Sequence, residues 1–223
     1  GHANTDIASD SLLQVLQTLP HDTTRLSTLN DIIKIEQNNY KCIQYSDTLM
    51  QEALKLKNDK YASLAAYYHL LYYYNRSEQD SVAKWIVRME PYVQRSGLWD
   101  YFFDAQRFQI DLYTFTEQYE LAISEANKMK QKALNTNSNR GTVAAYQCLS
   151  NAYIGSQRWD EGLKALEEAY RLLPKKGNAV VHISVLSQVI SVTKEMKDNN
   201  RQLKYLQELE SVLRKFIIDN PSL

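Results

Sequence analysis

Apolar residues recur every three to four positions along almost the whole chain, which is the period of an amphipathic α-helix. The pattern stops at short intervals, at residues that usually end helices. These breaks are Pro20, Asn38-Asn39, Asn58-Asp59, 75–77, Ser96-Gly97, Thr116-Glu117, 135–141, 156–158, 174–178 and 197–200. The intervals predict about ten helices of roughly 16 to 20 residues, after a shorter lead-in helix at about residues 8–19.

The composition favours helix throughout and requires no strand. Gly occurs only 6 times and Pro only 4 times in 223 residues, and no alternating Val/Ile/Thr-rich run is present. Helices of similar length with short polar joints form antiparallel hairpins, and successive hairpins bury their faces on one another. The length alone allows one domain or two. We predict a lead-in segment at 1–21, followed by a single helical-repeat domain at 22–223.

One stretch of about 35 residues repeats a known spacing of large and small side chains. Its first helix carries a stripe of aromatic, Leu and small residues, and its second helix opens with a small residue and ends before a Pro. The positions are Tyr146, Leu149, Ser150, Asn151, Ala152, Tyr153, Trp159, Asp160, Glu161, Gly162, Leu166, Ala169 and Pro174. This stretch resembles the tetratricopeptide repeat, although Tyr146, Ser150, Gly162 and Leu166 replace the residues that the family prefers.

Weaker copies of the repeat extend the resemblance in both directions. They are Leu26, Leu29, Ile33 with Cys42; Tyr67, Leu70, Leu71, Tyr74 with Ala83; and Gln106, Ile110, Tyr113 with Tyr119 and Ala122. A last pair, 180–196 and 200–217, keeps only the amphipathic rhythm. The copies are spaced by about 40 residues rather than the family's 34. The fold class that the resemblance implies is all-α, a right-handed superhelical stack of about five antiparallel helix pairs.

Charge and hydropathy exclude two classes of partner. Lys plus Arg equals Asp plus Glu at 26 each, so no basic field is available to hold nucleic acid. The longest mostly apolar stretch, 61–74, is too short to cross a bilayer. The chain begins Gly1-His2 without a Met and ends after an amphipathic helix, so we expect a piece of a longer protein that meets a membrane only through segments outside it.

No pattern predicts a catalytic residue, a metal site or a cofactor. The four histidines, at 2, 21, 69 and 182, show no pairing three or four residues apart, and neither Cys-x-x-Cys nor His-Glu-x-x-His occurs. Cys42 and Cys148 fall at apolar helix positions, which favours buried free thiols over a disulfide or a reactive thiol. Packing also explains Cys148 better than a nucleophile–base pair with His182.

Two polar segments are explained by structure rather than by chemistry. Lys175-Lys176-Gly177-Asn178 offers a single Gly after a helix-ending Pro, which is typical of a joint between helices and not of a phosphate loop. The neighbouring carboxylates Glu167-Glu168 fall on a predicted solvent face without an apolar surround. Enzyme function therefore has no positive support in the sequence.

The aromatic residues that cluster on neighbouring helices suggest a binding surface. In tetratricopeptide arrays the concave surface is lined by first helices, at positions beside the packing stripe. Carried onto this chain, the resemblance implies a groove lined by Tyr68, Tyr72, Arg76, Arg107, Asp111, Gln147 and Asn151. Tyrosines and a few polar groups suit a protein, peptide or small-molecule ligand. We single out Tyr72 and Arg107 as ligand contacts.

A second resemblance concerns the biological role. The phrases Asp10-Ser11-Leu12-Leu13-Gln14, Asp22-Thr23-Thr24-Arg25-Leu26 and 45–49 ahead of Ala53-Leu54 are similar to the amino-terminal tetratricopeptide-like regions of bacterial membrane sensor histidine kinases. The resemblance implies a periplasmic, non-catalytic input domain of a two-component signalling protein, which could act as a homodimer. The alternative is a free-standing scaffold for protein partners. A helical-repeat polysaccharide lyase is a third interpretation, but the sequence offers no candidate base.

Overall fold

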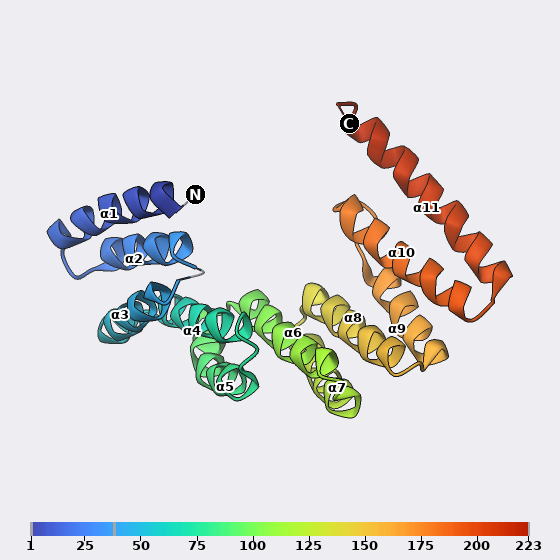
Figure 1. Cartoon of the computed structure of the whole chain (residues 1–223), viewed down its shortest axis with the longest axis horizontal. Coiled ribbons are helices and arrows are strands. Elements are labelled where there is room, and N and C mark those ends of the chain that lie inside the picture. Colours follow the sequence, from blue (N-terminus) through green and yellow to red (C-terminus); the bar gives the residue numbers. More distant parts are fainter. Residues whose placement is uncertain (1, 38, 223) are drawn as a thin grey trace. The chain divides into compact units, whose positions relative to one another are not determined.

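The computed structural model describes residues 2–37 and 39–222, with side chains from Ile7 onward, and the only regular secondary structure in these ranges is α-helix. The helices are α1 (His2–Thr18), α2 (Thr23–Ile35), α3 (Lys41–Lys55), α4 (Asp59–Tyr74), α5 (Gln79–Ser96), α6 (Trp99–Phe115), α7 (Tyr119–Asn135), α8 (Asn139–Gly155), α9 (Trp159–Leu172), α10 (Ala179–Glu195) and α11 (Asn199–Asp219) (Figure 1). The predicted all-α fold is confirmed, and the joints between the described helices fall at the predicted breaks, except that Asn38 of one break lies outside the described residues. The lead-in helix is longer than predicted, because neither Gly nor Pro interrupts the chain before Thr18.

The helices gather into two compact units, Gly1–Leu112 and Tyr113–Leu223. In the first unit α1 packs on α2, α2 on α3, α3 on α4 and α4 on α5. In the second unit α7 packs on α8, α8 on α9, α9 on α10 and α10 on α11. Packing of each helix on its neighbours in sequence is the organisation of a helical solenoid. The prediction of a single domain from residue 22 onward stays a prediction.

The joints between helices repeat one backbone device. A residue with left-handed backbone follows most helix ends, with φ between 51° and 77°, and these residues are 20 positions apart at Lys57, Ser77, Gly97, Glu117, Asn137 and Gln157, with Lys197 in the same register. After Lys57 the amide of Asn58 donates to the carbonyl of Ala53 at 2.8 Å, and the Asn58 side chain accepts from the amide of Tyr61. One residue thus closes one helix and caps the next. Two successive 20-residue segments, each a helix with its joint, explain the spacing of about 40 residues between copies of the repeat.

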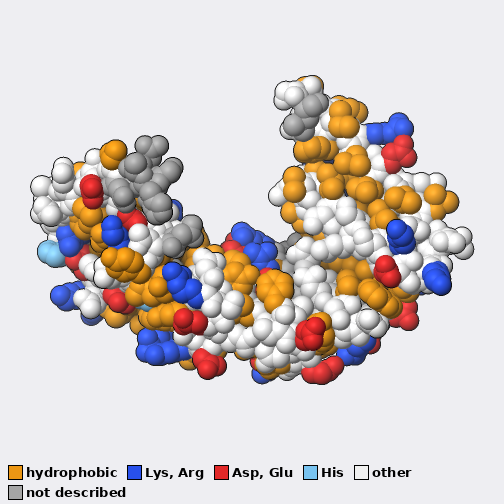
Figure 2. All heavy atoms as spheres, in the orientation of Figure 1, with side chains coloured by type: hydrophobic (Ala, Val, Ile, Leu, Met, Phe, Trp, Pro, Cys, Tyr) orange, Lys and Arg blue, Asp and Glu red, His pale blue; other side chains and the backbone are white. Residues whose placement is uncertain are grey.

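Each unit has its own apolar core. In the first unit Leu26, Leu29 and Ile33 of α2 are fully buried with Leu49 of α3. In the second unit Leu166 of α9 is fully buried in a cluster that α10 and α11 complete. Apolar side chains that remain at the surface gather along α11 (Figure 2).

The small residue of the repeat has the predicted role. A Cβ placed on Gly162 of α9 would lie 2.9 Å from the Ile154 Cγ1 of α8, so the glycine permits the close approach of these two helices. In the stripe of α8, Leu149 and Ser150 are buried, and Tyr146 and Tyr153 are half-buried. Cys42 and Cys148 are buried free thiols, as predicted, and burial raises the pKa of Cys42.

Candidate functional site

Tyr68 is not a groove residue, and the prediction for it is wrong. Its side chain is 3 % exposed, and its hydroxyl donates to the Asn30 Oδ1 at 2.5 Å. Burial raises the pKa of the Tyr68 hydroxyl far above its usual range. The reason is that α2 also packs on α4, and so covers a face that a two-helix repeat would leave open. Tyr68 therefore belongs to the core of the first unit.

Tyr72 of α4 and Arg76, two residues after the end of that helix, do lie at the surface, and we call the two together the α4 surface. Tyr72 is half-buried and Arg76 is exposed, with the guanidinium carbon 3.4 Å from the centre of the Tyr72 ring. Arg76 Nη1 also donates to the Tyr72 carbonyl at 3.0 Å, and the Tyr73 ring meets Tyr72 edge to face at 5.4 Å. This cation–π contact fixes the arginine over the ring. Tyr72 and Arg76 form an accessible polar-aromatic surface, and its role as a ligand contact stays a prediction.

Arg107 and Asp111 lie one turn apart on α6, beside the end of α4. The Tyr74 ring of α4 packs on the Phe108 ring of α6, with 4.7 Å between the ring centres, and so brings α4 and α6 together in this unit. Arg107 and Asp111 are half-buried, and the Arg107 Nε is a buried donor without a hydrogen-bond partner in the described part of the chain. Burial raises the pKa of Asp111 to about 6, against the opposing charge of Arg107. Because the Arg107 side chain is only half-buried, it is not fully enclosed under packed side chains. Its role as a ligand contact stays a prediction.

Asp111→Asn is expected to stabilise the protein at neutral pH but not in acid. The folded-state pKa of about 6 lies above the ordinary value of 3.8, so the protonated carboxyl is favoured by folding. The contribution of Asp111 to folding stability is therefore most favourable below about pH 4, and it is lost as the pH rises to about 6. The shift of about two units corresponds to at most about 3 kcal/mol, which partial exposure reduces to about 1–2 kcal/mol.

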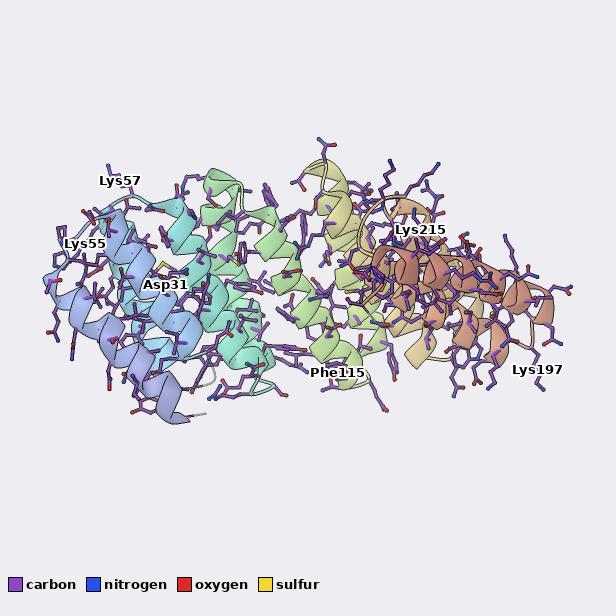
Figure 3. The ribbon with its side chains drawn as sticks, turned by 90° about the horizontal axis from the view of Figure 1, so that it is seen from above. Asp31, Lys55, Lys57, Phe115, Lys197 and Lys215 are labelled. Carbon is purple, nitrogen blue, oxygen red and sulfur yellow. The ribbon has the colours of Figure 1, made fainter. Side chains whose placement is uncertain are left out.

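Urea unfolding at pH 4 and at pH 7.5 measures this difference. Asp111→Asn should gain about 1–2 kcal/mol over the wild type at pH 7.5 and close to zero at pH 4. The exposed Asp31 of α2, labelled in Figure 3, provides the control substitution Asp31→Asn, which should gain no such pH-dependent advantage. An equal effect of Asp111→Asn at both pH values contradicts the assignment.

Gln147 and Asn151 of α8 belong to the second unit. Gln147 is half-buried, and its backbone carbonyl accepts a hydrogen bond from the Ser150 hydroxyl at 2.7 Å. The Asn151 side chain is exposed. They lie one turn apart on one helix, so both can contact the same ligand. The structure therefore brings the predicted residues together in two groups, one in each unit.

A groove in the first unit was missed by the sequence analysis. It has a volume of about 280 Å³ and is lined by Met50 of α3 and by Trp85, Arg88 and Tyr92 of α5; we call it the Trp85 groove. Met50 and Tyr92 pack on the core beneath, and Arg88 is exposed. The spacing of Trp85, Arg88 and Tyr92 at three and four residues was a signal for a shared helix face, but Met50 is added only by tertiary packing.

The Trp85 indole is held in place from behind. The His69 ring of α4 stacks on it at 3.9 Å with an angle of 18° between the planes. His69 is itself 1 % exposed, with Nδ1 2.8 Å from the Ala65 carbonyl and Nε2 2.7 Å from the Asp47 carboxylate. The Arg88 guanidinium carbon lies 4.8 Å from the centre of the Trp85 ring. The indole is therefore preorganised, which lowers the entropy lost when a ligand is bound.

A second pocket, of about 400 Å³, lies in the second unit where the joint between α9 and α10 meets the end of α11. Lys175 and Lys176 of the joint and His182 of α10 line it together with Lys215, Phe216 and Asp219 of α11, so basic groups outnumber the one carboxylate. The segment is a joint between helices, as predicted. Its lysines nevertheless share a concavity with an apolar wall, which suits an anion that carries an apolar group.

Chemistry that requires clustered ligands is not visible in the described ranges. No three His, Cys, Asp or Glu side chains there are placed to hold a metal ion. None of the helices in those ranges is both long enough and apolar enough to cross a membrane. Aromatic and basic side chains line the two pockets described above.

Comparisons with known proteins support the fold. No protein-family model matches the chain, and no curated protein matches it. Among solved structures, the crystal structure of BtubC (BKLC) from P. vanneervenii is similar, with a TM-score of 0.68 over 96 % of this chain and 90 % of that one. The two sequences are 12 % identical. BtubC is a helical-repeat protein, so the similarity supports the helical-repeat fold and leaves function open.

Proposed function

We propose that this chain is a non-catalytic binding domain that senses a ligand or protein partner. More specifically, we propose that it is the extracytoplasmic input domain of a membrane-bound bacterial two-component protein, in the periplasm. The resemblance of the phrases at 10–14, 22–26 and 45–49 to the input regions of sensor kinases supports the specific role, and helical-repeat proteins commonly use their surfaces to bind. A free-standing scaffold is the alternative.

The observation that carries the binding function is the Trp85 groove. Its lining combines Met, Trp, Arg and Tyr, the residue types that are enriched at protein interfaces. The volume of about 280 Å³ suits one large side chain rather than a whole peptide. Arg88 at the edge favours a carboxylate next to that side chain. The expected ligand is therefore a peptide segment with an apolar anchor beside an acidic residue.

Binding in this groove can be coupled to a signal. A ligand that contacts Met50 of α3 and Arg88 of α5 together stabilises the arrangement in which these two helices are closest. It shifts the population of helix arrangements only by the difference between its affinities for them. No catalytic residue is required for this mechanism.

A phage-displayed library of random 12-residue peptides tests the binding function. Peptides selected on the wild-type chain should share an apolar residue next to Asp or Glu. Met50→Ala combined with Arg88→Ala should weaken a selected peptide at least tenfold, equivalent to about 1.4 kcal/mol, in a fluorescence-anisotropy titration. We avoid substitution of Trp85 because its stacking on His69 also supports the core.

Two further variants locate the site. Tyr40→Ala removes a tyrosine that is 61 % exposed and does not line the groove, and it should leave the affinity unchanged within twofold. Tyr72→Ala combined with Arg76→Ala tests the α4 surface in the same assay. A library that yields no peptide sensitive to the groove or to the α4 surface argues against the binding function.

The gene that encodes the chain separates the two roles. A reading frame that continues into a membrane helix and a histidine-kinase region supports the input domain. A frame without these elements supports the scaffold, which would use the same binding surfaces without signalling output.

A further inference from the structure

The outer face of α11 is apolar and uncovered. Leu203, Leu206, Leu213, Ile217 and Ile218 are 58 %, 44 %, 38 %, 57 % and 76 % exposed. The face of α11 that packs on α10 is a different one, with Tyr205 buried and Leu209, Val212 and Phe216 half-buried. Figure 2 shows hydrophobic side chains running along this helix. The apolar arc of α11 is therefore wider than its packing on α10 requires.

The spacing of the exposed residues is that of a helix that pairs with another helix. Positions 203, 206, 210, 213 and 217 are separated by alternating steps of three and four, which place them in one stripe. Leu203, Leu206, Leu213 and Ile217 occupy four of the positions and Glu210 the fifth.

Glu210 lies in the stripe and Arg214 lies beside it. Their charges are complementary between two copies only when the two helices run in opposite directions. Glu210 accepts from the Arg214 Nη2 at 2.7 Å, and both side chains are well exposed. In a parallel pair Glu210 would face a second Glu210 inside an apolar seam, which is unfavourable. In an antiparallel pair centred between these residues, each Glu210 lies beside the other copy's Arg214, and each Leu206 lies near the other copy's Ile217. Antiparallel helix dipoles add to this preference.

The size of the surface suits a weak pair. Five side chains that are each about half exposed, with the polar groups between them, present on the order of 500 Å² per copy, so two copies would bury on the order of 1,000 Å². This value is at the lower limit for a specific interface. The chain has a net charge of zero, so long-range repulsion does not oppose self-association.

We infer that α11 is a homodimerisation helix, which pairs antiparallel with α11 of a second copy through Leu203, Leu206, Leu213 and Ile217. The pair is centred between Glu210 and Arg214 and is fixed in direction by their cross-pairing. This inference does not depend on the ligand of the Trp85 groove.

Sedimentation equilibrium between about 1 and 300 µM measures the association. The wild type should change from 25.9 kDa toward twice that mass, with a midpoint on the order of 10–100 µM. Leu206→Glu combined with Ile217→Glu should weaken association at least tenfold, and both positions are exposed enough for the monomer to stay folded by circular dichroism. Phe115→Glu is the matched control, since Phe115 at the end of α6 is 71 % exposed and labelled in Figure 3. A wild type that stays at 25.9 kDa, or a double variant that associates normally, overturns the inference.

A charge exchange tests the proposed direction. Glu210→Arg should weaken association at least tenfold, because the introduced guanidinium would then face the Arg214 of the second copy. Glu210→Arg combined with Arg214→Glu should restore association to within about threefold of the wild type. In a parallel pair, by contrast, Glu210→Arg replaces one like-charge contact by another and has little effect. That result overturns the antiparallel arrangement.

Disulfide trapping gives an independent readout of direction. A Leu206→Cys chain mixed with a mass-tagged Ile217→Cys chain should form mainly the mixed disulfide under mild oxidation, because these positions face each other only in the antiparallel pair. Cys42 and Cys148 are 1 % and 2 % exposed and should not compete. Predominance of disulfides between identical chains overturns the arrangement.

Discussion

Leu166→Ala is expected to lower the free energy of unfolding by about 3–4 kcal/mol, because it empties a fully buried position. Leu166 of α9 is 0 % exposed and lies in a cluster with Val185 and Val189 of α10 and Tyr205 of α11. A solenoid has no single central core, so the contact between neighbouring helices carries the stability of that part of the stack. The cavity would therefore loosen three successive helices.

Urea unfolding followed by circular dichroism measures the loss. Leu134→Ala is the control in the same unit, since Leu134 of α7 is 51 % exposed and should cost less than about 1 kcal/mol. Hydrogen exchange should show the loss of protection mainly in α9, α10 and α11. Equal destabilisation by the two substitutions would mean that Leu166 does not hold the stack together.

The helix boundaries were predictable because the joints contain residues with local preferences. Asn58, Ser138 and Asp198 each lie in a predicted break and cap the next helix with their side chains, as their residue types favour. The left-handed residue before the cap was not predictable. Lys57, Glu117 and Lys197 hold φ values of 51°, 62° and 56°, which residue type alone would assign to glycine. Packing of the flanking helices fixes that conformation.

The candidate site was only partly predictable, because burial depends on a third helix. The spacing of the repeat places Tyr68 beside the packing stripe, and a two-helix unit would leave it open. Instead, Asn30 of α2 accepts a hydrogen bond from the Tyr68 hydroxyl, and α2 covers that face of α4. Tyr72, one turn later, lies beyond this cover and stays at the surface. Similarly, Trp85, Arg88 and Tyr92 were visible as one helix face, but the wall that Met50 adds comes from another helix.

Removing one partner of the Arg25–Glu52 ion pair is expected to cost about 3 kcal/mol, far more than a surface pair. The Arg25 Nε lies 2.7 and 2.8 Å from the two Glu52 carboxylate oxygens, and its Nη1 donates to the Leu16 carbonyl at 2.8 Å. The two side chains are only 16 % and 13 % exposed. Arg25 thus joins α1, α2 and α3 at one point, and either single substitution leaves a poorly solvated charge, although Glu52 keeps the exposed His21 Nδ1 at 3.2 Å.

A double-mutant cycle with Arg25→Leu and Glu52→Leu separates the pair from its burial. Each single variant should lose about 3 kcal/mol in urea unfolding, and the double variant should lose clearly less than the sum, by about 1–3 kcal/mol, because no unpaired charge remains. The same cycle on the exposed Arg171–Glu168 pair of α9, whose side chains are 66 % and 38 % exposed, should give a coupling below about 1 kcal/mol. Additive losses at Arg25 and Glu52 would show that the two charges are solvated independently, and that the packing of α1 on α2 rests on apolar contacts such as that of Leu16 with the core.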